Sequence, residues 1–261
     1  MTLTTVDGYV GAVKQEVRWF KTGSRTTVAS IPFSLFDIAG APGAGTLAVG
    51  NTANGLVHTD ATAGYPTINA LSATGYLTRV EYGWNTAGRL SIYDRLFSAG
   101  AYTFNANVTL ASQPSYAGRV PGADYRGLEI WIETVTAFTG TPSFQINYLD
   151  QGGAAGDSGV VSAGAAMTVG RMYRMPLASG DTGVQQITQV RGTVATVGTF
   201  NVHVLRRLWG GRVIATNDGD IHDLMKTGAP QVYADSALFV MIQPDGTASA
   251  LPEVTMEIAD A

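Results

Sequence analysis

The sequence has no cysteine among its 261 residues and few charged ones. The first absence excludes disulfides, thiolate metal ligands and cysteine nucleophiles, and it fits assembly in a reducing cytoplasm. Charged residues make up 14% of the chain, and the formal net charge is −4. Because neutralising phosphates requires a basic surface, this composition argues against a protein that binds nucleic acid.

Long apolar runs are absent as well. No stretch approaches the roughly 20 apolar residues that cross a bilayer, so we expect no membrane association. Residues 1–20 lack the basic start and the apolar centre of a signal peptide, which indicates no export by that route. Hydrophobic residues nevertheless form 45% of the chain, enough for a sizeable core, and 32 glycines fit tight turns and close sheet packing.

Short alternating stretches, separated by glycine-rich turns, dominate the chain between Tyr125 and Leu208. In 128–133, for example, Leu and Ile alternate with Glu and Trp. A period of two places one face of a strand against a core and the other toward solvent or a partner. We therefore predict an all-β fold, with antiparallel strands in a sandwich or barrel, and further strands are indicated at 76–84, 144–148, 200–204, 237–242 and 253–258.

The predicted organisation is a helical arm over residues 1–24 and one β-sandwich domain over 25–261, with a loop-rich insertion at about 40–75 that holds one or two short strands. The arm either packs on its own sheet or docks its apolar face on a neighbouring subunit. The apolar residues at helical spacing are Val10, Val13, Val17 and Phe20. Asp7 is the capping residue at the start of the helix, and Gly23 is the glycine that ends it.

One stretch looks like a catalytic motif. Residues 156–159 (GDSG) look like the nucleophile loop of chymotrypsin-like serine proteases, and His58 and Asp94 precede Ser158 in that family's order. A triad needs a base beside the nucleophile and a carboxylate that orients the base. The match ends at Val160, where the family has a glycine, and His58 lacks the family's surrounding motif. A glycine-rich turn is the preferred interpretation, so we predict no catalytic residue and no enzyme.

Two groups of residues suggest metal binding. A cluster of oxygen ligands could hold calcium, although no glutamate stands at the twelfth position; it comprises Asn217, Asp218, Asp220 and Asp223. The three histidines are far apart in the sequence and match no zinc motif: His58, His203 and His222. An ordinary acidic turn is favoured, and we predict no metal and no cofactor.

Two further groups are candidates for binding or catalysis. Glu129 and Glu133 share a strand face about 13 Å apart, which is too far for two-carboxylate glycoside hydrolysis, and we expect both to be solvated. Arg206, Arg207 and Trp209 would form either a contact within or between subunits, or a platform for a glycan or nucleic acid.

Three stretches resemble a group of tailed-bacteriophage virion structural proteins: Thr141–Gly156, Pro176–Ile187 and Gly228–Tyr233. The resemblance extends over roughly 93–258. It implies an antiparallel β-sandwich of jelly-roll type and a non-enzymatic capsid decoration or cement protein. Such a protein would be assembled in the host cytoplasm as a homo-oligomer, with a trimer as the expected state, and bound to the major capsid protein or other virion proteins. The alternative is a tail- or fibre-associated module that binds a host glycan through exposed aromatic residues such as Trp131 and Trp209. A serine hydrolase is the third hypothesis.

Overall fold

The computed structural model describes residues 5–69, 71–72, 74–164, 167–193, 197–247 and 249–260. The chain is mostly β, with several antiparallel sheets, and it is sandwich-like, which confirms the predicted fold class. The residues form two compact units. Unit 1 comprises Met1–Gly45, Thr59–Asp94 and Leu208–Ala261, and unit 2 comprises Thr46–His58 and Arg95–Arg207. None of the helices in the described part of the chain is long and apolar enough to cross a membrane.

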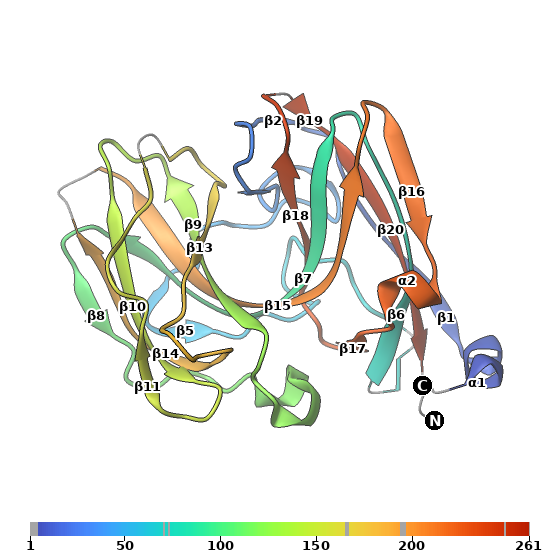
Figure 1. Cartoon of the computed structure of the whole chain (residues 1–261), viewed down its shortest axis with the longest axis horizontal. Helices are drawn as coiled ribbons and strands as arrows, with labels where there is room; N and C mark the ends of the chain where they lie inside the picture. The colour runs from blue at the N-terminus through green and yellow to red at the C-terminus, as the bar shows by residue number, and fades with distance from the viewer. Residues whose placement is uncertain are drawn as a thin grey trace. The chain divides into compact units, whose positions relative to one another are not determined.

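Unit 1 contains a sheet in which the first and last long strands are neighbours, so that Val17 lies opposite Met256 and Trp19 opposite Val254 (Figure 1). The two-stranded sheet β2–β19 and helices α1 and α2 also belong to the unit, and its core contains Trp19, Ile92 and Met256. The strands of this sheet are β16 (Asp218–His222), β6 (Thr74–Trp84), β20 (Pro252–Asp260), β1 (Lys14–Lys21) and β4 (Gly40–Ala41), with β17 (Gln231–Tyr233) also paired to β6.

The remaining elements of unit 1 lie outside this sheet. Strand β18 pairs with β3 and with residues 88–94 of β7. Their bounds are β18 (Leu238–Pro244), β3 (Phe33–Ser34), β7 (Gly88–Thr103), β2 (Arg25–Thr26), β19 (Ser249–Ala250), α1 (Val6–Gly11) and α2 (Leu224–Thr227).

Unit 2 contains two groups of paired strands around one core. In the first group the order is β11-β10-β14-β8 with β12 beside β10, and in the second β9 lies between β13 and β15, while β5 pairs with β7. The bounds are β5 (Asn51–Leu56), β8 (Asn107–Thr109), β9 (Leu128–Thr136), β10 (Ser143–Asp150), β11 (Ala155–Asp157), β12 (Val161–Ser162), β13 (Met172–Met175), β14 (Val184–Thr193) and β15 (Thr199–Val213), with 3₁₀ turns η1 (Ala117–Arg119) and η2 (Pro121–Ala123).

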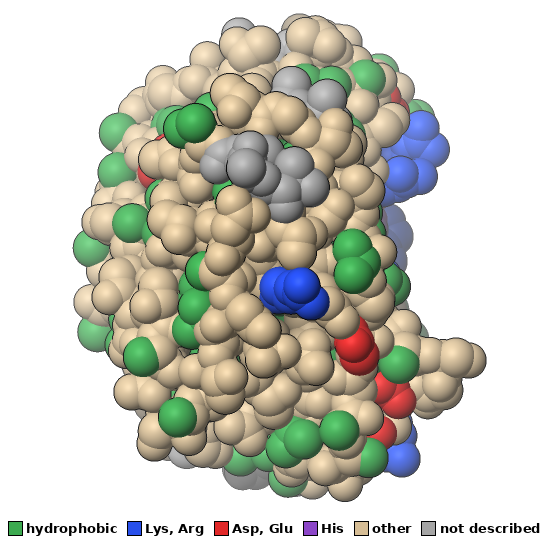
Figure 2. Space-filling view, turned by 90° about the vertical axis from the view of Figure 1, so that its left-hand side faces the viewer, with side chains coloured by type: hydrophobic (Ala, Val, Ile, Leu, Met, Phe, Trp, Pro, Cys, Tyr) green, Lys and Arg blue, Asp and Glu red, His purple; other side chains and the backbone are tan. Residues whose placement is uncertain are grey.

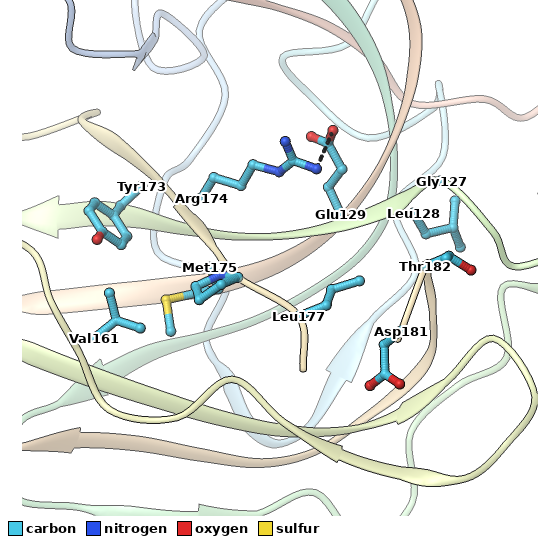
Figure 3. A pocket seen from close by; sticks show the side chains of 11 residues that line it. Gly127, Leu128, Glu129, Val161, Tyr173, Arg174, Met175, Leu177, Asp181 and Thr182 are labelled. Atoms are coloured by element: carbon cyan, nitrogen blue, oxygen red, sulfur yellow. Dashed lines mark ion pairs between the residues drawn. The ribbon is translucent and has the colours of Figure 1, made fainter. Parts of the chain in front are cut away.

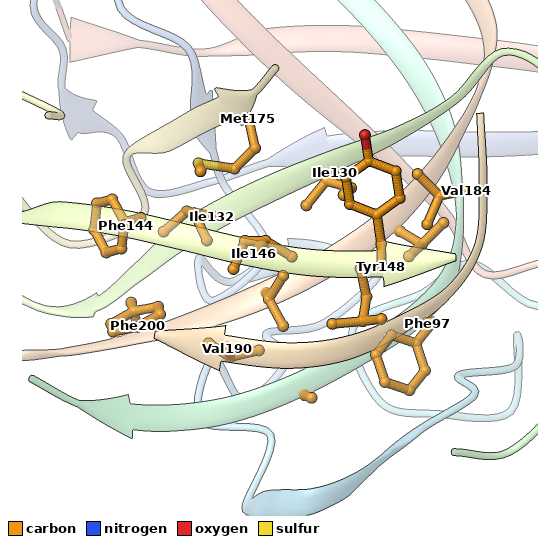
Figure 4. Close-up of a cluster of buried hydrophobic side chains, with 14 of the residues drawn as sticks. Phe97, Ile130, Ile132, Phe144, Ile146, Tyr148, Met175, Val184, Val190 and Phe200 are labelled. Carbon is orange, nitrogen blue, oxygen red and sulfur yellow. The ribbon is translucent and has the colours of Figure 1, made fainter. Parts of the chain in front are cut away.

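Aromatic and branched side chains fill the core of unit 2 (Figure 4). Phe144 on β10 lies edge-on to Phe200 on β15, with ring centroids 4.8 Å apart. Ile130 and Ile132 on β9 belong to the same cluster. These are the apolar positions that the alternating pattern assigned to a core face, so the predicted inward faces of β9, β10 and β15 are confirmed.

The N-terminal helix is much shorter than predicted. Helix α1 begins after Thr5, whose side-chain oxygen accepts a hydrogen bond from Gly8 N, and it ends at Gly11. The continuation to Gly23 is wrong, because residues 14–21 form β1. Val17 is buried in this strand. Pairing with β20 provides hydrogen-bond partners for the main chain, and it outweighs the helical spacing of Val10, Val13, Val17 and Phe20. Helix α1 has no buried residue.

Between residues 40 and 69 the described chain contains the short strands β4 and β5 among turns. The predicted division into an arm and one domain over 25–261 stays a prediction, because a compact unit is not by itself an independently folding domain.

Candidate functional site

Unit 2 holds a group of polar side chains inside its core. We call it the buried polar cluster; every member is at most 3% exposed, and the members are Arg95, Ser98, Arg119, Glu133, Asn201 and His203. They come from β7, η1, β9 and β15. Buried polar groups are costly unless they are hydrogen-bonded, so the partners of these side chains decide what the cluster can do.

A chain of two hydrogen bonds runs through the cluster. Ser98 Oγ lies 2.7 Å from His203 Nδ1, and His203 Nε2 lies 3.0 Å from Glu133 Oε2. Because ionised Glu133 can only accept, the network assigns the imidazole proton to Nε2 and lets Ser98 donate to Nδ1. Hydroxyl, imidazole and carboxylate thus follow one another as in an acyl-transfer triad.

This chain of side chains is closed to substrate. Ser98, Glu133 and His203 are each 0% exposed. Burial, followed by the charge of Arg95, lowers the pKa of His203 to about 4, so the imidazole is neutral at neutral pH. A nucleophile must be reachable, and its base must meet the proton that it abstracts in a plausible substrate pose. In this structure the three residues therefore act as an internal hydrogen-bond network.

The charged members of the cluster bind one another and the main chain. Arg95 Nη2 lies 3.9 Å from Glu133 Oε2. Arg119 donates through Nη1 to the carbonyl oxygen of His58 at 2.6 Å and through Nη2 to that of Arg95 at 2.8 Å. Asn201 Nδ2 donates to the carbonyl oxygen of Leu47 at 2.6 Å. These contacts fasten residues 46–58 to the rest of unit 2.

The prediction that Glu129 and Glu133 are solvated is wrong. Glu133 belongs to the buried polar cluster, and the Glu129 carboxylate accepts from Trp131 Nε1 at 2.8 Å and pairs with Arg174 at 3.1 Å. The reason is that β9 is covered on both faces, so that its polar positions face protein instead of water. Sequence alternation cannot separate a polar face toward solvent from a polar face inside a cluster.

The residues of the protease-like motif have other partners. Asp94 accepts hydrogen bonds from Ser236 Oγ and Ala237 N at 2.9 and 3.0 Å. Ser158 Oγ accepts from Ile146 N and donates to the Gly159 carbonyl oxygen, each at 2.9 Å. The positive φ of Gly159 forms the tight turn that the glycine-rich interpretation expected. None of these contacts links Ser158 or Asp94 to His58.

The acidic residues follow a turn instead of forming one, because Asp218 and Asp220 lie in β16 and Asp223 precedes α2. Asp220 and Asp223 make local contacts. Asp223 caps α2 by accepting from Met225 N and Lys226 N, both at 3.1 Å, and Asp220 lies 3.5 Å from Lys226 Nζ. In the part of the chain that the structure describes, no group of three or more histidine and carboxylate side chains is arranged to hold a metal.

The tryptophans proposed for glycan binding are buried, so the expectation that they are exposed is wrong. Trp131 donates to Glu129, and Trp209 Nε1 donates to His222 Nδ1 at 3.0 Å. The Trp209 ring also meets the ring of Tyr82 edge-on at 4.8 Å. Neither indole offers a stacking platform. The adjoining arginines differ, because Arg206 is buried and Arg207 is exposed.

Unit 2 also has an open surface pocket of about 670 Å³ where β13 ends (Figure 3). Tyr173, Met175 and Leu177 line it with apolar surface, and the Glu129–Arg174 ion pair lies along one side. The loop after β13 is fixed, because Tyr148 OH donates to Asp181 Oδ2 at 2.7 Å and accepts from Ala178 N at 2.6 Å. The pocket is thus preformed, and four of its lining residues, Pro176, Leu177, Asp181 and Thr182, belong to the stretch 176–187 of the sequence resemblance.

Comparisons with known proteins are sparse. No family model matches the sequence, and no curated protein matches it. Among solved structures the chain is similar to a mutant VP2 of infectious bursal disease virus in T=1 particles, at 8% identity and a TM-score of 0.19, covering 95% of this chain and 78% of that one. A VP2 subviral particle of the same virus gives 7% identity and a TM-score of 0.18, covering 95% and 80%. This structural similarity to viral capsid proteins is weak, and TM-scores of this size do not establish a shared fold.

Proposed function

We propose that this protein is a non-enzymatic virion structural protein, a capsid decoration or cement protein that stabilises a bacteriophage particle by contacts between subunits. The observation that carries the proposal is the closure of the buried polar cluster: the histidine, hydroxyl and carboxylate groups best arranged for chemistry, Ser98, His203 and Glu133, hold the fold together out of reach of any substrate. The resemblance of residues 141–156, 176–187 and 228–233 to phage virion proteins supports the same function.

The surface is consistent with this role. Figure 2 shows one face of the molecule on which hydrophobic and charged side chains are scattered among backbone and small polar groups. Of the charged residues that line the pocket of unit 2, Glu129 pairs with Arg174, and Asp181 accepts a hydrogen bond from Tyr148 OH. We propose that the protein assembles as a homo-oligomer, with a trimer as the expected state. The oligomer would bind the major capsid protein or another virion protein and bury about 1,000 Å² or more at each contact. The tail-module alternative has no comparable support, because its aromatic residues are buried.

Particles assembled without this protein are expected to lose genome at lower temperature, or after milder osmotic shock, than complete particles. A cement protein buries interface area that opposes opening of the shell, so a shell without it opens more easily. The measurement is dye access to packaged DNA during heating, with purified protein added back as the control. Equal release temperatures in both preparations would exclude a cement function.

An active-site phosphonate is expected to leave Ser158 unlabelled in the native protein. Its hydroxyl is engaged by the main chain of residues 146 and 159, and no contact joins it to a histidine base. Intact-mass spectrometry after incubation measures this, with a known serine hydrolase treated in parallel. A stoichiometric adduct that peptide mapping places on Ser158 would overturn the non-enzymatic assignment.

A further inference from the structure

Residues 46–58 cross the buried polar cluster as a narrow strip of chain, which we call the strap. The strap belongs to unit 2, whereas the residues on both sides of it in the sequence, up to Gly45 and from Thr59 onward, belong to unit 1. Its strand β5 pairs with β7, where Asn51 lies opposite Gly100 and Leu56 opposite Ser98. The strap therefore lies directly beside the serine of the hydrogen-bond chain.

Polar contacts provide most of the attachment of the strap. Three of its carbonyl oxygens accept hydrogen bonds from buried side chains. The Leu47 oxygen accepts from Asn201, the Thr52 oxygen accepts from Tyr102 at 2.9 Å, and the His58 oxygen accepts from Arg119. Several of its side chains are exposed, and its apolar contribution to the core is small, consisting of the buried Leu47 and the partly buried Val57. Segments with few buried apolar contacts open at lower cost than the body of a sandwich.

The groups facing the two histidines are mainly cationic. His203 is faced by Arg95 and Ser98 from β7 and by Glu133 from β9, while His58 on the strap is near Arg95, Arg119, His203 and Glu133. With both imidazoles neutral, this group contains two cations and one anion. With both protonated it would contain four cations and one anion in a buried site, which is strongly unfavourable.

We propose that the strap is an acid-sensitive latch: protonation of His58 and His203 releases residues 46–58 from unit 2 and uncovers the buried polar cluster. The proposal goes beyond the structural role proposed above and does not depend on it, since it concerns the isolated chain. Release would give unit 2 a second conformation in acid, in which Ser98, Glu133 and His203 meet water.

The direction of the pH dependence follows from the closed state. Burial, then Arg95, lowers the pKa of His203 to about 4, and burial, then Arg95, His203 and Arg119, lowers that of the half-buried His58 to about 3. In the released state both return toward the ordinary value of about 6.5. The open form thus binds more protons below pH 6.5. Each histidine then favours opening by up to about tenfold per pH unit, so the two together give at most about 100-fold per unit, with the steepest change near pH 5.

Hydrogen exchange of the full-length protein tests the latch. Protection of the strap amides, corrected for the intrinsic pH dependence of exchange, should fall between pH 6 and pH 4, by up to about 100-fold per pH unit near pH 5. His203→Gln and His58→Gln each remove one titrating group, so each should reduce the dependence to about tenfold, and the double variant should abolish it. His222→Gln, in unit 1, is the matched control and should keep the full dependence.

Amides of β10 separate latch release from unfolding. The latch requires the strap to lose protection while β10, in the core of the same unit, keeps it. Parallel loss of protection in β10 and the strap would mean that unit 2 unfolds as a whole, and it would overturn the proposal. The proposal would also be overturned if protection of the strap did not change between pH 6 and pH 4 in the unaltered protein. This measurement does not depend on whether any variant folds. Either outcome leaves the virion role testable by the particle experiment.

Discussion

Replacing Glu133 with alanine is expected to lower the free energy of unfolding by about 3–5 kcal/mol. The substitution removes the carboxylate that lies 3.9 Å from Arg95 and 3.0 Å from His203 Nε2. The Arg95 guanidinium would remain at a site with 2% side-chain exposure without that countercharge. Urea denaturation measures the loss: the variant should unfold at a lower urea concentration at the midpoint, while the dependence of the unfolding free energy on urea stays the same.

Two other carboxylate variants test whether the loss of stability comes from removing a buried charge partner or from removing any carboxylate. Glu133→Gln keeps the size and an acceptor for His203, so part of the stability should return. Glu253→Ala removes an exposed carboxylate that lies 3.8 Å from Arg18, and it should cost no more than about 1 kcal/mol. If Glu133→Ala were as mild as Glu253→Ala, the buried polar cluster would not stabilise unit 2.

Phe144→Ala is expected to cost about 3–5 kcal/mol as well, through a different mechanism. Phe144 is fully buried, and its ring centroid lies 4.8, 5.8 and 6.2 Å from those of Phe200, Phe104 and Phe138. Truncation would leave a cavity among aromatic rings that the two paired strand groups hold in place. Thermal and urea unfolding should both show the loss.

Size and position distinguish this effect from a general sensitivity to substitution. Phe144→Leu fills most of the space and should cost clearly less than alanine. Val160→Ala changes an exposed side chain and should stay within about 0.5 kcal/mol of the unaltered protein. A Phe144→Ala variant as stable as Val160→Ala would contradict the packing of the core in Figure 4.

The strands could be predicted because their signal is local. Alternation located β9, β10 and the first half of β15, and the continuous apolar run at 237–242 located β18, because both patterns follow from which faces a strand buries. Alternation breaks down within β6, where the neighbours Leu77 and Thr78 are both buried although adjacent residues of a regular strand point to opposite faces. The pairing with β20 shifts at Glu257–Ile258, and such a bulge changes the face that later residues present.

The buried polar cluster could not be predicted because its parts come together only in the tertiary structure. Ser98, Glu133 and His203 lie on three strands, and nothing in their immediate sequence marks them as partners. The sequence motif that did stand out, around Ser158, is a turn. The N-terminal error has the same origin: Val13 and Val17 fit a helix by spacing, while pairing of β1 with β20, distant in sequence, decides the structure.

The pairing of β1 with β20 also bears on synthesis. Unit 2 is interrupted only by residues 59–94, and its last residue, Arg207, precedes β20 by more than forty positions. The sheet of unit 1, in contrast, needs Lys14 to meet Ala259. On a ribosome that emits about 5–20 residues per second, unit 2 can close several seconds before the sheet of unit 1 receives β20. During that interval the nascent chain carries β1 and β6 with unpaired edges, so folding begins in unit 2, and unit 1 waits for the last strand to emerge.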